Sequence, residues 1–431
     1  MIGNYLRMLR LFNRNVRLYL VSGALIGFTT AGGIYGVLLN LYLLRLGYGL
    51  EFIGIISATG AISFAAFSLP AGALGRRLGT RWMMTAGMVL IVVGNISLPL
   101  AEFVSSSWQA EYLLLTRLPR AMGFAMYMVN ASPFLMGATS AQERTHVFAV
   151  QAALWPLAGF AGSLAGGFLP GFFSSILAIP ADGPEPYRYT LFVAGALLTP
   201  AVWALLNTNE VGVKPQQENE ESAEPQQEKL VSGVSASAPW GAIVFIALVA
   251  LFQTAGFAGI QTFFNVYLDE SLAVSTGLIG TLTATGQLLG GIAALATPVL
   301  AARLGHARLV LWGSLGTIFC FIPLVALSHW GMAGLAFVGI SAFTTIRFAA
   351  FAVYQQEMIG TRWRSMMSGA TSMASGLSFS TISLVGGYLV PSLGYGSFFF
   401  LSAALTALGT IIFWIFNRVP GGAFATKFSG T

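Results

Sequence analysis

One polar stretch of this 431-residue chain decides the fold, because it separates two long apolar halves. Residues 207–239 read NTNEVGVKPQQENEESAEPQQEKLVSGVSASAP, with six glutamates, two lysines and no aromatic side chain. Such a segment has too little apolar surface to fold, so we expect a disordered acidic linker. On both sides of it the chain is apolar in runs of about 20 residues or more, the length that an α-helix needs to cross a membrane.

The composition excludes a soluble protein. Hydrophobic residues make up 56% of the chain and charged residues only 8%, whereas a soluble surface needs about a quarter of its residues charged. The apolar runs are continuous, unlike the short alternating segments of a membrane β-barrel. We count twelve runs, at residues 17–44, 51–75, 82–101, 109–137, 145–169, 187–206, 240–268, 273–302, 309–328, 332–359, 365–391 and 395–417. The sequence therefore predicts an all-α membrane protein with twelve transmembrane helices in two pseudo-symmetric six-helix bundles, residues 1–206 and 240–431.

The positive charges predict the orientation of the chain. With the N-terminus inside, 16 of the 21 lysines and arginines fall in the termini, the linker and the loops on the same side, and only Arg45 and Arg188 fall outside. An excess of Lys and Arg marks the cytoplasmic side of a membrane protein. We therefore expect both termini and the linker in the cytoplasm and the chain in the cell inner (plasma) membrane. The first 20 residues show no cleavable signal peptide.

The two halves repeat each other. The segment NLYL at 40–43 reappears as NVYL at 265–268, IGIISATG at 53–60 as IGTLTATG at 279–286, and RAMGFAMY at 120–127 as RFAAFAVY at 347–354. Repeats of six spans each run parallel and are related by an axis along the membrane normal. That arrangement is typical of transporters that rock two bundles around a site near the middle of the membrane.

Three local motifs carry a family resemblance that extends over essentially the whole chain. The loop GALGRRLGTR at 72–81 resembles the G-x-L-x-D-R-x-G-R-[RK] motif of the major facilitator superfamily, with Arg76 in place of the Asp. The fourth span resembles the R-x-x-Q-G-x-G motif of drug/proton antiporters through Arg117 and Gly123. GSLAGG at 162–167 is similar to the exporter motif G-P-x-x-G-G. The resemblance implies a secondary transporter with rocker-switch alternating access, similar to the drug/proton-antiporter-like branch, with export slightly favoured over uptake.

Three arginines lie inside the predicted spans. Arg117, Arg120 and Arg347 fall near the middle of the fourth and tenth spans, where a lone Arg costs at least about 2.5–3.5 kcal/mol and needs a partner or a cavity. No carboxylate of the sequence lies at the same depth. We expect an anionic group of the substrate to balance these charges, since Arg holds carboxylates and phosphates in a bidentate way. The alternative is that the arginines bind backbone carbonyls within each bundle.

Further candidate substrate-binding residues follow from the repeat. Arg120 and Arg347 are equivalent positions, and each is followed by Phe at i+4 and Tyr at i+7, which stay on the same helix face. Amide side chains in the first and seventh spans are candidates for binding or for helix–helix contact in equal measure. The residues added by these two patterns are Phe124, Tyr127, Phe351, Tyr354, Asn40, Asn265 and Gln261.

Energy coupling has one candidate carboxylate. Glu357 is the only acid inside a predicted span, near its cytoplasmic end. The competing interpretation is a salt bridge from Glu357 to Arg362 or Arg144 at an inner gate that also includes Arg76 and Arg77. An arginine neighbour would lower the pKa of the carboxyl and oppose a proton-carrying role near neutral pH. Either a proton or a counter-anion therefore remains open as the coupling ion.

The sequence predicts no enzyme. It has one cysteine and three histidines, and it has no nucleophile–base set, no paired carboxylates and no phosphate-binding loop. We expect no cofactor, no metal and no nucleic acid, and a monomer whose partners are membrane lipid and a small amphipathic, anionic organic substrate. The alternatives are a nutrient or organic-anion importer or facilitator and, in another class, a non-transporting membrane receptor or scaffold.

Overall fold

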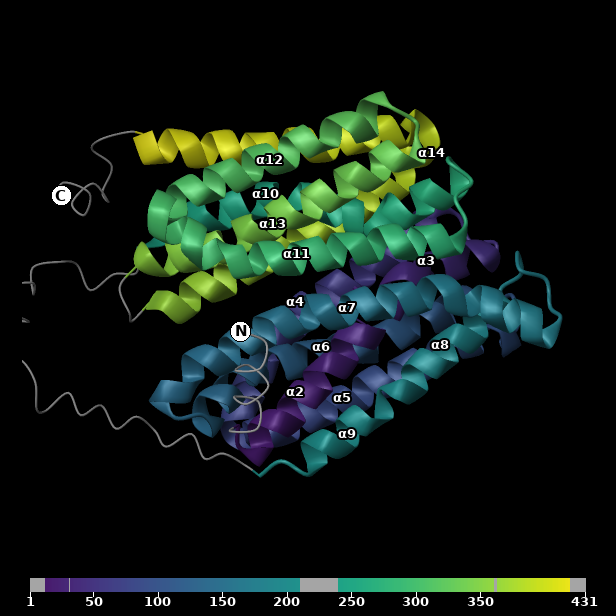
Figure 1. The fold of residues 1–431 in the computed structure, drawn as a ribbon, viewed down its shortest axis with the longest axis horizontal. Coiled ribbons are helices and arrows are strands. Elements are labelled where there is room, and N and C mark those ends of the chain that lie inside the picture. The colour runs from purple at the N-terminus through teal and green to yellow at the C-terminus, as the bar shows by residue number, and fades with distance from the viewer. Residues whose placement is uncertain (1–11, 31, 210–238, 360–362, 419–431) are drawn as a thin grey trace, which may run out of the picture.

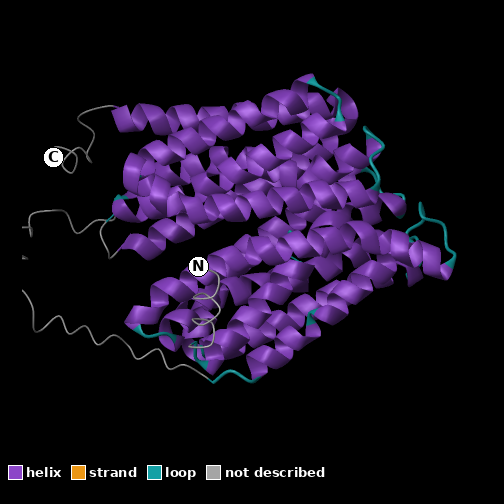
Figure 2. Ribbon diagram, viewed as in Figure 1, coloured by secondary structure: helices purple, strands orange, loops and turns teal. Residues whose placement is uncertain are grey.

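The computed structural model describes residues 12–30, 32–209, 239–359 and 363–418. In these ranges the chain is helical and has no strand (Figure 2). The predicted linker lies almost wholly outside the described residues. The first bundle holds α2 (Arg14–Thr29), α3 (Ile34–Arg45), α4 (Leu50–Leu78), α5 (Thr80–Ser97), the 3-10 helix η1 (Leu98–Phe103), α6 (Gln109–Ala138), α7 (Ala141–Leu177), α8 (Glu185–Leu197) and α9 (Thr199–Leu206). The second holds α10 (Trp240–Glu270), α11 (Thr276–Leu304), α12 (His306–Ala326), α13 (Trp330–Glu357) and α14 (Arg364–Arg418).

The helices confirm the twelve predicted spans. Ten helical stretches of the described chain are long and apolar enough to cross a membrane; α2 with α3, α5 with η1 and α8 with α9 each count as one stretch. Helix α6 is not among these ten stretches, but its 30 residues are long enough to cross a membrane, and it carries Glu111, Arg117 and Arg120. Helix α14 is two spans, because its backbone leaves the helical region at Gly394, where φ is +81°. That break lies between the predicted runs 365–391 and 395–417.

The two bundles touch mainly along two helix pairs and separate at one end. Helix α7 packs on α11, and α4 packs on α14. Figure 1 shows the bundles closest at the end with the α3–α4 and α7–α8 loops and spread apart at the end where α9 ends, α10 begins and α14 ends. We call the second end the linker side and the first the far side.

Glycines make the far-side contact possible. A Cβ added to Gly167 of α7 would lie 2.9 Å from the Cα of Gly280 on α11, and one added to Gly54 of α4 would lie 3.1 Å from the Cα of Gly387 on α14. Without side chains at these positions, two backbones approach to van der Waals contact, as in other membrane helix pairs. The sequence run GSLAGG thus forms part of the interface between the bundles.

Replacing Gly167 with Ala is expected to destabilise this interface. The added methyl group has no room, and overpacking of this kind costs about 1–3 kcal/mol. The measurement is the unfolding temperature of the purified protein, which should fall for Gly167→Ala. The control is Gly171→Ala in the same helix, where nothing lies within 4 Å of the added Cβ and where Ala favours the helix. An unchanged or higher unfolding temperature for Gly167→Ala would contradict the close approach.

Candidate functional site

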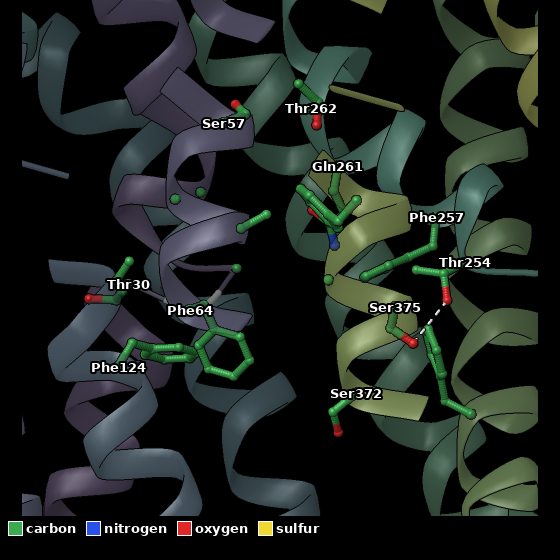
Figure 3. Close-up of a pocket in the computed structure, with 18 of the residues that line it drawn as sticks. Thr30, Ser57, Phe64, Phe124, Thr254, Phe257, Gln261, Thr262, Ser372 and Ser375 are labelled. Atoms are coloured by element: carbon green, nitrogen blue, oxygen red, sulfur yellow. Dashed lines mark hydrogen bonds between the residues drawn. The ribbon is translucent and has the colours of Figure 1, made fainter. Parts of the chain in front are cut away.

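A cavity of about 830 Å³ lies between the two bundles. Its walls come from α3, α4, α6 and α7 on one side and from α10, α11, α13 and α14 on the other, as the close-up in Figure 3 shows for part of the lining. The volume is within the range of pockets that enclose drug-sized ligands. This position, at the junction of the sequence repeats, is where the repeat predicts a substrate site.

The first bundle contributes two arginines from α6. Arg117 and Arg120 both line the cavity. An Nη atom of Arg117 lies against Gly60 of α4, only 2.9 Å from where a Cβ would be, and the guanidinium of Arg120 lies 5.5 Å from the ring centre of Tyr35. Gly94 of α5 leaves room for the stem of Arg120, since a Cβ there would lie 2.8 Å from the Arg120 Cβ. Glycines at positions 60 and 94 thus leave room for both arginine side chains to reach the cavity.

The second bundle contributes Arg347 from α13 in a matching environment. Arg347 is 1% exposed, donates from Nη1 to Oε1 of Gln253 at 3.2 Å, and lies 4.2 Å from the ring centre of Phe348. Gly313 of α12 leaves room for its stem, since a Cβ there would lie 3.0 Å from the Arg347 Cβ. The equivalence of Arg120 and Arg347, predicted from the sequence repeat, therefore extends to the glycine packed behind each.

Several polar atoms around the cavity are buried without a hydrogen-bond partner. Buried polar groups are almost always satisfied, so a cluster of exceptions indicates a missing ligand or water. The lining itself, as described, contains no Asp, Glu, Lys or His. The three guanidinium groups are therefore the only ionic groups that face this space within the described residues. The unpartnered atoms of the lining are Nε and Nη1 of Arg117, Nε of Arg120, Nε of Arg347, Nε1 of Trp155 and Oε1 of Gln355.

The remaining lining combines aromatic rings with neutral hydrogen-bonding groups. Phe64 and Phe124 project from the first bundle, and Phe257 projects from the second (Figure 3). The second bundle also supplies a row of hydroxyl and amide groups, in which Oγ1 of Thr254 and Oγ of Ser375 lie 3.4 Å apart. Other members of this row are Gln261, Gln355, Thr371 and Ser372. The cavity can therefore hold a molecule with an anionic group, an apolar ring and neutral polar substituents.

A break in the first span brings a helix N-terminus to the cavity. Helix α2 ends at Thr29 and α3 begins at Ile34, and both Thr30 and Gly32 line the cavity. Gly32 has φ +79°, and its carbonyl accepts a hydrogen bond from the Ser163 hydroxyl at 2.5 Å. The first N–H groups of a helix lack internal partners and carry a partial positive charge. Apolar length alone does not predict this break; its sequence signal is the run TTAGG at 29–33, inside an otherwise apolar span.

The structure brings most of the predicted substrate-binding residues together. Seven of the ten predicted residues line the cavity: Arg117, Arg120, Arg347, Phe124, Phe351, Asn40 and Gln261.

The expectation that the two tyrosines share this lining is wrong. Tyr127 is fully buried, hydrogen-bonds to Ser22 at 3.0 Å and stacks on Tyr19, whereas Tyr354 donates to Oδ1 of Asn417. Each lies two turns beyond its arginine and packs within its own bundle, although on α13 the next residue, Gln355, still lines the cavity. The stripe therefore faces the cavity only as far as the Phe at i+4.

Asn40 and Asn265 connect the bundles to each other. The Asn40 amide donates to the Thr262 carbonyl at 2.7 Å, and the Asn265 amide, which does not line the cavity, donates to the carbonyls of Gly36 at 3.0 Å and Val37 at 3.3 Å. These reciprocal hydrogen bonds join α3 and α10. The sequence favours substrate binding and helix–helix contact equally for these two amides. In the structure both amides make helix–helix hydrogen bonds.

An ion pair closes the far side next to these amides. Arg45 at the end of α3 donates from Nη1 to Oδ2 of Asp269 at 2.8 Å and from Nη2 to Oδ1 at 2.7 Å. Tyr187 of α8 and Thr276 of α11 add a hydroxyl–hydroxyl contact of 2.8 Å between the bundles. Bidentate pairs of this kind combine charge with fixed geometry. Together these contacts join the two bundles on the far side.

The predicted linker-side gate is only partly described. Oε1 of Glu357 lies 3.1 Å from Nδ1 of His306, so its described partner is a histidine rather than an arginine. Arg362 and the side chain of Arg144 lie outside the described residues. Arg76 and Arg77 are exposed at the end of α4. Glu357 is absent from the cavity lining, which weakens its candidacy as a coupling carboxylate.

Asp269→Asn is expected to open the far side. The neutral amide cannot pair bidentately with Arg45, so conformations with separated far-side ends gain population. With Cys320 replaced by Ser, spin labels at Ser107 and Ser271 report the distance between the two bundles on that side, and we predict a longer-distance population in the variant. Asp182→Asn, which removes an exposed far-side carboxylate without an ion pair in the described chain, is the control. Identical distance distributions for Asp269→Asn and the parent would show that the pair does not hold the bundles together.

Comparisons with known proteins agree with this architecture. A family model described as Major Facilitator Superfamily matches residues 20–381. Solved structures similar to this chain include the inward-open xylose transporter XylE from E. coli, with a TM-score of 0.73, 15% identity, and coverage of 96% of this chain and 98% of that one. A search of curated protein sequences gave no match.

Two further solved structures show the same fold. The nucleoside transporter NupG has a TM-score of 0.69 and 14% identity, with 94% of this chain and 99% of that chain covered. A bacterial homologue of the human lysosomal transporter Spinster, in an inward-facing and occupied conformation, has a TM-score of 0.67 and 15% identity, with 94% and 96% covered. At these identities the likeness establishes the fold alone.

Proposed function

Because the chain belongs to the Major Facilitator Superfamily, we propose that it is a secondary transporter that carries a small amphipathic organic anion through the membrane by rocker-switch alternating access. The observation that carries the proposal is the set of three cavity-lining arginines with unpartnered N–H groups and no carboxylate in the described lining. A bound anion would satisfy both the charges and the free donors.

The energetics favour an anionic substrate over a neutral one. Each arginine inside a span is costly unless it meets a counter-charge or water, and within the described residues the hydrogen bonds of Arg347 are confined to the neutral amide of Gln253. Guanidinium groups form paired hydrogen bonds with carboxylates and phosphates, which are about twice as strong as neutral ones. The N-terminus of α3, beside the same cavity, adds a favourable dipole.

The rest of the lining supports an amphipathic cargo. Phe64, Phe124 and Phe257 offer apolar ring surfaces, whereas Gln261 and Ser375 offer neutral hydrogen bonds. An aromatic acid with hydroxyl substituents would use all three kinds of contact. Sugars without charge would leave the arginines unpaired, which burial makes unfavourable.

The closed far side supplies a starting state for alternating access. We place the linker side in the cytoplasm of the inner membrane, as the positive charges predict, so the cargo enters from the cytoplasm in this state. Separation of Arg45 from Asp269 and of Asn40 and Asn265 from the opposite backbones would then open the far side. Export, as in the drug-antiporter-like branch, is the direction that the partial motifs favour.

The lining supports a counter-anion as the coupling ion. Proton coupling requires a group that binds and releases a proton near the cargo, and the described lining has no Asp, Glu or His. An anion from the opposite side could neutralise the arginines during the return step. The protein would then exchange one anion for another.

Arg120→Gln and Arg347→Gln test the substrate class. Loss of a hydrogen bond to a charged group costs about 1.5–3 kcal/mol, which corresponds to roughly 10- to 150-fold in affinity. In proteoliposomes we expect saturable uptake of hydroxylated aromatic carboxylates or phenyl phosphates to fall by this factor in either variant. Arg303→Gln, an exposed arginine outside the lining, is the control. Unchanged transport of every candidate anion in both variants would remove the anion proposal, and absence of any saturable uptake by the parent would favour a receptor or scaffold.

Anion exchange predicts a specific response to gradients. Proteoliposomes preloaded with an unlabelled substrate anion should take up labelled anion faster than empty ones, whereas an imposed pH gradient should leave the initial rate unchanged. The pair of conditions is measured on the same preparation. Accumulation driven by the pH gradient without internal anion would instead establish proton coupling.

A further inference from the structure

A second cavity lies on the outer flank of the second bundle. Its volume is about 1130 Å³, and its walls come from the end of α11 and from α12, α13 and the last part of α14. No residue of the first bundle lines it, and in Figure 1 α12 and α14 lie on the side of the second bundle that faces away from the first. The groove is therefore separate from the central cavity and faces the surrounding lipid.

The groove is apolar along its length. Trp312 of α12 is 62% exposed, and Ile411 and Trp414 of α14 are 52% and 43% exposed. Leu304, Leu311 and Leu315 complete this wall. Exposed apolar side chains are ordinary on a lipid-facing surface, but here they border a hollow that is larger than the pockets of drug-sized ligands. An acyl chain is an occupant with matching chemistry.

The linker-side end of the groove is basic. Arg308 lies in the first turn of α12, and Arg418 is the last residue of α14, with its guanidinium 4.5 Å from the ring centre of Trp414. One carboxylate shares this end, Glu357, and it is paired with His306 at 3.1 Å. Neither arginine has an ion pair within the described chain. Two cations are thus left at the linker-side ends of α12 and α14, the level at which we expect phospholipid phosphates.

We propose that this groove binds an anionic glycerophospholipid from the linker-side leaflet, with its phosphate between Arg308 and Arg418 and an acyl chain along Trp312 and Ile411. Basic pockets between transmembrane helices at the membrane surface bind anionic lipid headgroups, and tryptophan is favoured at the same level. A second copy of the chain fits less well, because its linker-side ends are themselves basic, at Arg76, Arg77 and Arg303.

Lipid retention tests the site directly. The full-length protein is reconstituted in bilayers of equal parts phosphatidylglycerol and phosphatidylethanolamine, extracted gently and examined by native mass spectrometry. The parent should retain phosphatidylglycerol in preference to phosphatidylethanolamine. The double variant Arg308→Gln with Arg418→Gln should lose about 25-fold in affinity for it, from about fivefold per arginine. The control, Arg14→Gln with Arg303→Gln, removes two exposed charges outside the groove and should retain the lipid like the parent.

Photo-crosslinking provides a second readout that does not depend on the arginines. Phosphatidylglycerol with a photoactivatable acyl chain should label the segments around Trp312 and Ile411 more than Phe319, which is 63% exposed on the same α12 but outside the groove. Equal lipid retention in both double variants, or labelling without preference, would overturn the proposal. A dimer that the groove variant abolishes, with no lipid retained by the parent, would assign the groove to a second copy instead.

Discussion

Three guanidinium groups line the central cavity with no carboxylate beside them in the described lining, and this is the constraint on which the structure depends. An unpaired cation in hydrocarbon is costly, so the surrounding helices must keep a space that water or an anion can enter. The two bundles provide that space by meeting on the far side and parting toward the linker. In the alternating access that we propose, the charges would remain accessible while the opening changes sides.

Glycines at helix contacts make room for the arginine side chains and for close packing of the bundles. Gly94 and Gly313 leave room for the stems of Arg120 and Arg347, and Gly167 and Gly280 let the bundles touch on the far side. In a membrane there is little hydrophobic force between helices, so close backbone approach and hydrogen bonds hold them together. Few polar contacts join the bundles within the described residues, so they can break and re-form during transport. They include the hydrogen bonds from the Asn40 and Asn265 amides and the ion pair between Arg45 and Asp269.

The sequence predicts the architecture well, because apolar length and the internal repeat are strong signals over the whole chain. It also predicts that the three arginines face a cavity, since a charged residue inside an apolar span needs a partner or water. It does not predict which side chains of a helix turn into their own bundle, because that depends on tertiary packing, so the repeat pattern wrongly places Tyr127 and Tyr354 in the lining. The histidine partner of Glu357 depends on tertiary contacts that no local pattern encodes, whereas the break before Ile34 has a short local signal, the run TTAGG at 29–33.

The central claim is that cationic groups in the central cavity recognise a negative charge on the cargo. The most direct measurement is equilibrium binding to the purified protein of an aromatic hydroxy-acid, such as 4-hydroxyphenylacetate, against its neutral primary amide, which has nearly the same shape. The structure predicts that the acid binds at least about tenfold more tightly, equivalent to about 1.4 kcal/mol. Equal affinity for the acid and the amide, or tighter binding of the amide, would contradict the account.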